Sequence, residues 1–344
     1  MAHDWLLVET LGREPAVVAL GNQLRNLVPI TVFLRRNPRR AAIQSAIAES
    51  LQTSKSLVSI TPKNDRVIRT EPVLMSDGLI HGVHVWSGPA TDEPPERPIP
   101  GPLKWDMTLG VATDTPESLA NTGRNMDVED PEGRAFAECW PSGDLKPNEG
   151  KALAAAVRSE PGHTVCDTWD STDWQGNHIR VSFVARNGLE PGLDGRDHMI
   201  ARGMNWRAEP ADRARPADRL AQQILHGLAQ PGVHRALFDP HNWTLLKWLD
   251  EPCPFYDWRR IGTDPRMHPS DEAKMAAMTA EFAGGATRGV LRMPGHDGDW
   301  VPVHVTVNRV EVDQDLFAGL VSLRLPTPTE LAEADLPNTA TNGD

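Results

Sequence analysis

Cysteine, basic charge and long apolar runs are all scarce in this sequence, and each scarcity excludes a class of protein. Three cysteines without CxxC spacing indicate a reducing cytoplasm rather than a disulfide framework. The 35 Lys and Arg residues against 47 Asp and Glu residues leave a formal charge of −12, which argues against binding to nucleic acid or an anionic membrane. Because no run reaches about 18 apolar residues and the first residues lack a basic n-region, we expect neither a membrane-spanning helix nor a signal peptide.

Motifs of the common catalytic folds are also missing. The sequence contains no GxSxG elbow, P-loop or HExxH pair, and no GxGxxG loop after a strand. Asp194 and His198 could form a carboxylate–histidine pair, but their segment is more typical of a loop entering a strand. His81 and His84 stand three apart on a predicted strand, so they point to opposite faces and cannot bind one metal together. We therefore predict no catalytic residue and no metal site, and the cofactor stays unknown.

Proline and charge patterns divide the chain into domains. Six prolines between Ser87 and Lys104 predict an extended linker at residues 89–103. A second linker, residues 209–231, is expected to hold a helix with the stripe Leu220, Ile224 and Leu228, which either packs on its neighbouring domain or serves as a signalling or dimer helix. The acidic tail, residues 327–344, is expected to be disordered.

The first domain, residues 1–88, mixes predicted helices and strands. Pro15 is expected to begin a helix and Val28–Leu34 to form a strand. A second helix should follow Asn37-Pro38, with a hairpin turn at Ser76-Asp77-Gly78. The apolar stripes of the two predicted helices are Val17, Leu20, Leu24 and Leu27, then Ile43, Ile47 and Leu51. This order resembles a compact GAF domain, and a PAS domain is the alternative.

The third domain, residues 232–326, carries the clearest pattern. The string HPSDE at His268 precedes an amphipathic helix, the string RMPGHDGDW from Arg292 joins two strands, and GLVSLR from Gly319 closes the sheet. These strings resemble the second half of a PAS sensor domain over about 90 residues. The resemblance implies a domain that binds a ligand or a partner protein.

The second domain, residues 104–208, repeats this plan. Trp174–Ile179 matches His296–Val301, each a turn that enters a long alternating strand, and this repeat favours a tandem array. We also expect a strand at Met107–Ala112 and a helix at Pro147–Ser159. The whole chain resembles actinobacterial, mycobacterial-type proteins with three GAF-like and PAS-like sensor domains and no output domain.

Candidate pocket residues follow from the PAS resemblance. Alternation on the strand 300–307 puts its valines on one face, where they would line a cavity beneath the helix 272–282. Aromatic side chains before the main helices would complete the walls, and Arg292 could pair with an acidic ligand group. The candidates are Trp140, Trp258, Met275, Met278, Phe282, Val303, Val305 and Arg292. A core filled by these same side chains is the alternative.

The sequence thus predicts an α+β chain of three tandem sensor domains, each an antiparallel sheet covered by helices. We expect a cytoplasmic signal-sensing protein that binds a small molecule, a signalling protein or both, and relays its state by conformational change. Whether the chain forms a homodimer is left open by the sequence. The alternatives are an interaction scaffold that binds no ligand and, less favoured, an enzyme with an interdomain site. A void above about 300 Å³ would favour the ligand.

Overall fold

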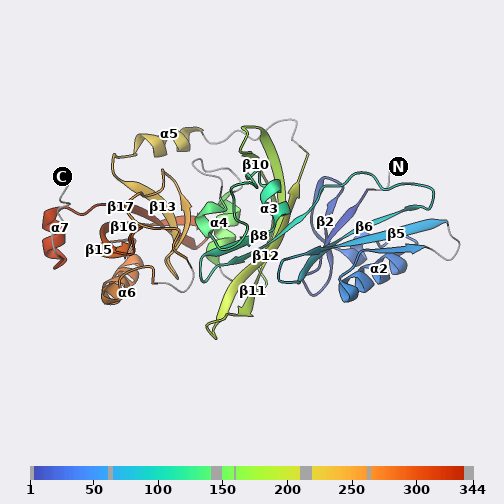
Figure 1. Cartoon of the computed structure of the whole chain (residues 1–344), viewed down its shortest axis with the longest axis horizontal. Helices are drawn as coiled ribbons and strands as arrows, with labels where there is room; N and C mark the ends of the chain where they lie inside the picture. The colour runs from blue at the N-terminus through green and yellow to red at the C-terminus, as the bar shows by residue number, and fades with distance from the viewer. Residues whose placement is uncertain are drawn as a thin grey trace. The chain divides into compact units, whose positions relative to one another are not determined.

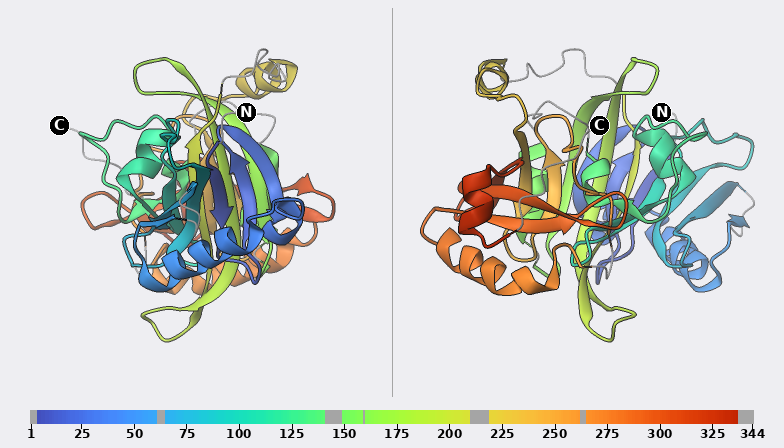
Figure 2. Two further views of the ribbon diagram at one scale, coloured as in Figure 1. Left: turned by 90° about the vertical axis from the view of Figure 1, so that its right-hand side faces the viewer. Right: turned by 60° about the vertical axis from the view of Figure 1, so that its left-hand side comes forward.

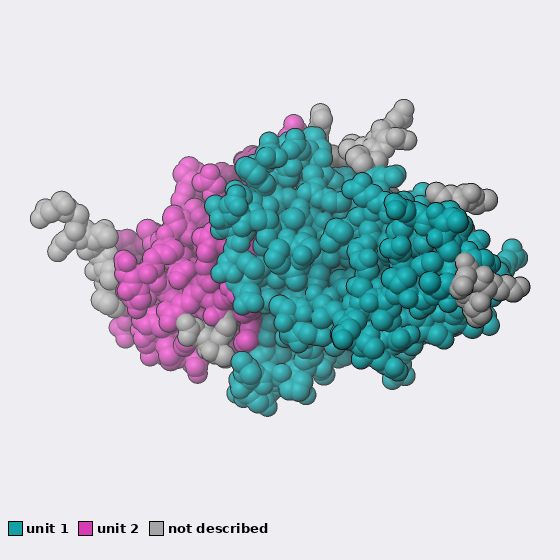
Figure 3. Space-filling model, turned by 45° about the vertical axis from the view of Figure 1, so that its right-hand side comes forward, with its two compact units in different colours: residues 1–106, 112–132, 159–215 teal, residues 107–111, 133–158, 216–344 magenta. Residues whose placement is uncertain are grey.

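The computed structural model describes residues 4–60, 65–140, 149–158, 160–209, 219–261 and 265–336. The chain forms two compact units (Figure 3). Unit 1 comprises residues 1–106, 112–132 and 159–215, and unit 2 comprises residues 107–111, 133–158 and 216–344. The strands lie in antiparallel sheets, so the prediction of an α+β chain built from three such sheets with helices is confirmed (Figure 1).

Unit 1 holds the first two sheets. The order of the first sheet is β3-β2-β1-β6-β5-β4, and the second places β10, β11, β12, β7 and β8 side by side. The elements of the first sheet are β1 (Leu6–Glu9), β2 (Ala16–Leu20), β3 (Gln23–Pro29), α1 (Ile30–Phe33), α2 (Arg40–Thr53), β4 (Leu57–Ile60), β5 (Arg66–Leu74) and β6 (Ile80–Pro89). Those of the second are β7 (Gly101–Asp106), β8 (Val111–Asp114), α3 (Pro116–Asn121), β10 (Thr164–Thr172), β11 (His178–Pro191) and β12 (Asp197–Arg207).

Alternation along β1 explains how unit 1 is packed. Leu6 and Val8 face α2, which lies against β5 and β6 (Figure 2), and they share a core with Ile43 and Ile47. Leu7 points the other way and packs with side chains of the second sheet, including Val184, Met204 and Trp206. The first sheet is therefore covered by a helix on one face and by the second sheet on the other.

Unit 2 holds the third sheet, in the order β14-β13-β17-β16-β15. Helix α6 packs on β15 and β16, and α4 packs on β16 and β17. The elements of unit 2 are β9 (Arg134–Ala135), the 3₁₀ turn η1 (Phe136–Glu138), α4 (Glu149–Arg158), α5 (Arg219–Gly227), β13 (His234–Asp239), β14 (Thr244–Trp248), the 3₁₀ turn η2 (Pro269–Asp271), α6 (Glu272–Phe282), β15 (Ala286–Pro294), β16 (Trp300–Asp313), β17 (Leu316–Arg324) and α7 (Pro328–Glu333).

Two predictions for the first domain are wrong. The helix expected after Pro15 is the hairpin β2-β3, in which Leu20 pairs with Gln23 across a two-residue turn. Gly21 begins that turn with φ +54°, a conformation that glycine adopts without a Cβ penalty. The strand expected at residues 28–34 is divided between β3 and α1. The helical spacing of the apolar residues was a coincidence, because β2 buries its apolar side chains and β3 packs Leu24 and Leu27 partly buried beside them.

Two further expectations also fail. Residues 107–110 form a turn rather than the start of a strand, and Gly110 takes φ +68° there. The tail expected to be disordered begins with α7, where the Thr327 hydroxyl accepts from the Glu330 N–H and Glu330 accepts in return from the Thr327 N–H. This reciprocal capping, with Pro328 at the first helical position, stabilises the helix start. Residues 337–344 lie outside the described residues.

Other local predictions hold. The Ile43 and Ile47 stripe is buried on α2, and the turn at residues 76–78 joins β5 to β6. Between the end of β6 and Gly101, residues 92–100 of the proline-rich linker form no helix or strand. Among the described residues, no helix is long and apolar enough to cross a bilayer.

Candidate functional site

A small cavity lies between α6 and the third sheet. Its volume is about 90 Å³. Met275 reaches it from α6, and Val305 reaches it from β16. The other lining residues are Phe238, Asn242, Trp243, Arg266, Met267, Leu291, Met293, Val321 and Leu323. Because most of these side chains are apolar, the cavity offers few partners to a water molecule and suits an apolar group.

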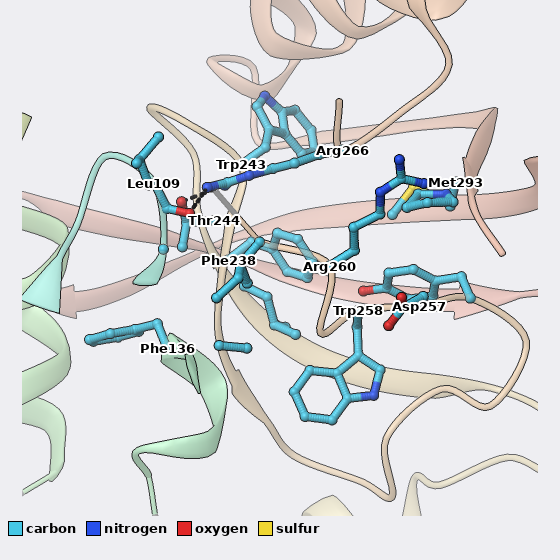
Figure 4. Close-up of a pocket in the computed structure, with 16 residues that line it drawn as sticks. Leu109, Phe136, Phe238, Trp243, Thr244, Asp257, Trp258, Arg260, Arg266 and Met293 are labelled. Atoms are coloured by element: carbon cyan, nitrogen blue, oxygen red, sulfur yellow. Dashed lines mark hydrogen bonds between the residues drawn. The ribbon is translucent and has the colours of Figure 1, made fainter. Parts of the chain in front are cut away.

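A second, aromatic pocket of about 60 Å³ adjoins the first (Figure 4). Trp258, Tyr256 and Phe136 line it, and the side chains of Arg260 and Arg266 supply its cationic groups. Phe238, Trp243, Arg266 and Met293 line both spaces. The two cavities are therefore neighbours that share four side chains.

Trp243 is the most unusual of the shared residues. It sits in the turn between β13 and β14 with φ +58°, in the left-handed region that bulky residues rarely occupy. Its indole Nε1–H donates to the Thr279 hydroxyl of α6 at 2.9 Å. Arg266 stands beside it and donates to Thr244 Oγ1 and to the Leu109 carbonyl, both at 2.6 Å. Two of the side chains that line both cavities are thus bonded to α6, to the β13-β14 hairpin and to the turn at Leu109.

The phenol of Tyr256 and the thiol of Cys253, near the aromatic pocket, are held un-ionised. Trp248 packs against Tyr256 and Trp258, with ring centroids 6.5 and 5.8 Å apart. Burial raises the pKa of Tyr256, and it raises the pKa of the Cys253 thiol to about 12. At neutral pH this region therefore presents rings and an un-ionised thiol rather than a phenolate or thiolate nucleophile.

The structure distributes the predicted pocket residues over several places. Met275 and Val305 line the cavity beneath α6, and Trp258 lines the aromatic pocket. Phe282 and Val303 lie in the apolar core of the third sheet, which Met278 also joins while bordering an open groove beside β15. Apart from Trp258, these side chains belong to α6 and to the strand β16 on which α6 packs.

Two of the predicted pocket residues lie elsewhere. Arg292 makes two hydrogen bonds from its guanidinium to Asp271, at 3.0 and 2.7 Å. Burial opposes ionisation of Asp271, but the bonds from Arg292 prevail and hold the pKa of that carboxyl below its usual value. Arg292 therefore fixes the start of α6. Trp140 is buried against Phe136, with ring centroids 5.7 Å apart, and does not line either cavity.

Sequence reasoning missed Trp243 and Arg266. The left-handed backbone of Trp243 has no sequence signal, because glycine and asparagine are the residues that commonly indicate such positions. Arg266 lies in an irregular segment, where no periodicity assigns a direction to its side chain. Only the packing of β13, β14 and α6 brings these residues together.

The carboxylate–histidine pair considered at Asp194 and His198 does form, in unit 1. Asp194 approaches His198 Nε2 at 3.0 Å, and Asp106 approaches Nδ1 at 2.7 Å. The hydrogen bond to Asp106, followed by the opposing effect of burial, leaves the pKa of His198 raised. Because carboxylates occupy both ring nitrogens, His198 ties the loop between β11 and β12 to β7 and presents no free lone pair. Within the described ranges, no group of three or more His, Cys, Asp or Glu side chains could hold a metal ion.

Comparison with known proteins identifies the family. The Rv3651-like N-terminal, middle and C-terminal domain models match residues 4–96, 99–208 and 218–334. The crystal structure of an uncharacterized protein from Mycobacterium tuberculosis aligns with 98% of this chain and 100% of its own, at 64% identity and a TM-score of 0.88. No curated protein matches the chain.

Two other solved structures align weakly. The E. coli DhaR(N)–DhaL complex covers 61% of this chain and 80% of its own at 11% identity and a TM-score of 0.20. An RNA-binding light-oxygen-voltage receptor covers 97% and 98% at 10% identity and a TM-score of 0.26. Neither likeness carries an argument at such scores. The three domain matches and the mycobacterial relative confirm the predicted likeness to three-domain proteins of mycobacterial type, and the chain belongs to the Rv3651-like family.

Proposed function

We propose that this chain is a signal-sensing protein whose third domain binds a small apolar molecule beneath α6. The observation that carries the proposal is the cavity of about 90 Å³ between Met275 and the sheet, divided by Trp243 from the aromatic pocket. The PAS resemblance of the sequence from His268 to Leu325 supports it, because that resemblance implies a ligand or partner site at this place. The three free cysteines support a cytoplasmic location. We propose no catalytic step.

The size of the cavity restricts the ligand. Pockets for drug-sized ligands measure about 300–1,000 Å³, whereas a water molecule occupies about 30 Å³ of liquid. A space of about 90 Å³ therefore takes only a few heavy atoms unless a wall moves. Trp243 is the wall best suited to move, since its left-handed backbone is strained by about 1–3 kcal/mol and one hydrogen bond fastens its ring to α6.

The same residue supplies a route for the signal. A ligand that displaces Trp243 would break its bond to Thr279 and so release a contact of α6. A ligand that binds this open state better than the closed one would shift the population toward it. The change would then be read on the side of α6 that borders the groove beside β15, where Lys274 and Glu281 lie.

Native mass spectrometry on the full chain, purified without added ligand, tests the proposal. We expect an extra mass that is lost on denaturation, and we expect the Met275→Trp variant, which fills the cavity, to lack it. The Met275→Leu variant is the matched control, because it keeps the cavity apolar and roughly its size. An adduct that persists in Met275→Trp would place the ligand elsewhere and contradict the proposal.

An interaction scaffold that binds no ligand is the second candidate. The small volumes of the two cavities favour it, because both are well below the usual range for ligands. If the wild-type chain shows its bare mass and benzene fails to stabilise it against heat, the scaffold is the better account. A thermal shift that Met275→Trp abolishes would decide for the sensor.

A further inference from the structure

Strand β15 lies at the edge of the third sheet, with one side toward β16 and, among the described strands, no partner on the other side. The outward side is identified by three hydrogen bonds to residues outside the sheet. The Arg292 carbonyl accepts from the His268 N–H at 2.8 Å, and the Arg292 N–H donates to Asp271 Oδ2 at 2.8 Å. The Pro294 carbonyl accepts from the Asp257 N–H at 2.8 Å. The even-numbered residues of β15 therefore direct their backbone groups away from the sheet.

The other half of the same edge is open. Arg288 and Val290 lie four and two residues before Arg292, and β15 pairs with β16 without a bulge. By the alternation of a strand, their N–H and C=O groups therefore also point outward. Within the part of the chain that the structure describes, no residue bonds to these backbone groups. The chain thus covers one half of an edge strand with its own polar groups and leaves the other half unpaired.

Side chains flank the open half of the β15 edge on both sides. A groove of about 450 Å³ runs along Arg288, Gly289 and Val290, with side chains of α6 on one side and of α7 on the other. Met278 of α6 forms an apolar patch of the first wall, and Glu333 of α7 belongs to the second. An edge that must only avoid aggregation is usually covered, charged or bulged. Here a shaped groove stands over unpaired backbone groups.

We propose that an extended cationic segment of a partner protein adds to β15 as a further strand at Arg288–Val290. An extended polypeptide presents paired N–H and C=O groups at every second residue, about 6.8 Å apart, and that spacing matches Arg288 and Val290. This match selects a polypeptide over a compact small molecule. The partner's backbone supplies the affinity, and its alternating side chains meet the two walls.

The charge of the groove selects the side chains of the partner. Glu281, Glu330 and Glu333 line the groove together with Lys274 and Arg288, and the charge of −12 on the chain as a whole favours a cationic partner. Burial lowers the pKa of His304, so this ring adds no positive charge at neutral pH. Arg324 already pairs with Glu330, which leaves Glu333 to receive a lysine or arginine of the partner.

The opposite wall selects apolar side chains. Gly289 lies beneath Met278, and a Cβ at that glycine would stand only 3.0 Å from the Met278 sulfur. The missing side chain leaves Met278 against the strand, where its flexible thioether can adapt to an entering residue. A partner that alternates small apolar and cationic residues therefore fits both walls.

Fluorescence anisotropy on the full chain with labelled acetyl-Lys-Val-Lys-Val-Lys-Val-amide tests the proposal. We expect saturable binding that weakens with salt and is at least about fivefold weaker for the matched Glu-Val peptide. Arg288→Pro removes an outward N–H that the sheet does not use, so it should weaken binding by at least about fivefold. Arg288→Ala keeps the N–H and should bind at least as well as the wild type.

N-methylated peptides test the geometry without changing the protein. In a peptide that adds as a strand, alternate amides face β15 and the others face solvent. Of two peptides methylated on alternate sets of amides, one should lose binding and the other should keep it. Absence of binding at millimolar peptide, equal loss from both methylated peptides, or equal affinity of Arg288→Pro and Arg288→Ala would overturn the proposal.

Discussion

Unit 1 and the third sheet of unit 2 differ in the contacts that cover their sheets. In unit 1 two sheets share one core, and buried polar groups join them. Glu9, 1% exposed in its side chain, accepts two hydrogen bonds from Arg186, and His81 Nδ1 lies 2.7 Å from the Gly203 carbonyl. The third sheet packs under α6 with apolar side chains and leaves two cavities, a left-handed tryptophan and an open strand edge.

The polar core of unit 1 and the apolar core of the third sheet differ in how readily they can rearrange around a ligand. Buried hydrogen-bonded pairs demand one geometry, because a shifted partner leaves a buried charge unsatisfied. Apolar contacts around a void tolerate rearrangement, since few directional bonds are lost when a side chain moves; for Trp243 it is the single bond to Thr279. Unit 1 is therefore suited to hold its two sheets together, and the third sheet is suited to change shape when a ligand binds.

The largest expected effect comes from breaking the polar link in unit 1. Arg186→Ala leaves the Glu9 carboxylate buried without its guanidinium, and we expect the free energy of unfolding to fall by about 3 kcal/mol. The control is Arg158→Ala, which removes the exposed pair with Asp313 and should cost below about 1 kcal/mol. Urea denaturation followed by circular dichroism measures both. Equal losses of stability in the two variants would show that the Glu9–Arg186 pair stabilises the protein no more than an exposed ion pair does.

A smaller loss is expected at the cavity wall. Trp243→Gly should lower the free energy of unfolding by about 2 kcal/mol, because lost packing is partly offset by relief of the left-handed strain. The same variant joins the two cavities, so benzene should raise its melting temperature more than that of the wild type. Trp174→Gly, at an exposed position of unit 1, is the control, and benzene should raise its melting temperature by the same amount as that of the wild type. A benzene shift no larger than that of the wild type would contradict the partition by Trp243.

The stability of unit 1 should depend on pH through His198. The hydrogen bond to Asp106 keeps the pKa of His198 above its ordinary value near 6.5. Its contribution to stability is therefore complete below about pH 6.5 and is lost as the pH rises through the raised pKa. The stability advantage of the wild type over His198→Gln should shrink as the pH increases across this range. Thermal melts of both proteins from pH 5 to pH 9 measure it, and an advantage that grows with pH would refute the assignment.

The smallest effect concerns two exposed apolar residues, Ile224 on α5 and Leu228 directly after it. Ile224 and Leu228 are 51% and 65% exposed, so replacing both with serine should change the free energy of unfolding by less than about 0.5 kcal/mol. If this stripe serves a homodimer, the same double variant should be monomeric under conditions where the wild type associates. Light scattering during gel filtration measures the mass. A wild-type monomer, or a dimer that survives the replacement, would remove α5 from this role.

The sequence predicted the third sheet well because its signals are local. The alternation of β16, the stripe of α6 and the turn at Gly298 each follow from neighbouring residues. The errors near Pro15 and in the tail arose from short signals that were overlooked, the Gly21-Asn22 turn and the Thr327-to-Glu330 capping pattern. Better reading of those residues would have corrected both elements.

Most of the candidate site could not be read from the sequence. Met275 and Val305 were placed correctly around α6 because helical and strand periods determine their faces. Trp243 and Arg266 meet only through the packing of a hairpin against a helix, and their positions depend on contacts far apart in the chain. The open half of β15 could not be predicted from a single sequence. It follows from the position of β15 at the edge of the sheet and from the outward direction of the Arg292 N–H.

The most direct test of the account is a benzene titration followed by NMR of methyl-labelled methionines. We expect saturable shifts for the methyl groups of Met275 and Met293, which line the cavity, and, with a ¹⁵N label, for the indole N–H of Trp243 as its bond to Thr279 breaks. We expect no shift for Met204, which is fully buried in unit 1. Equal shifts at all these methionines, or no saturable shift at Met275, would contradict the claim that the third domain holds the sensing cavity.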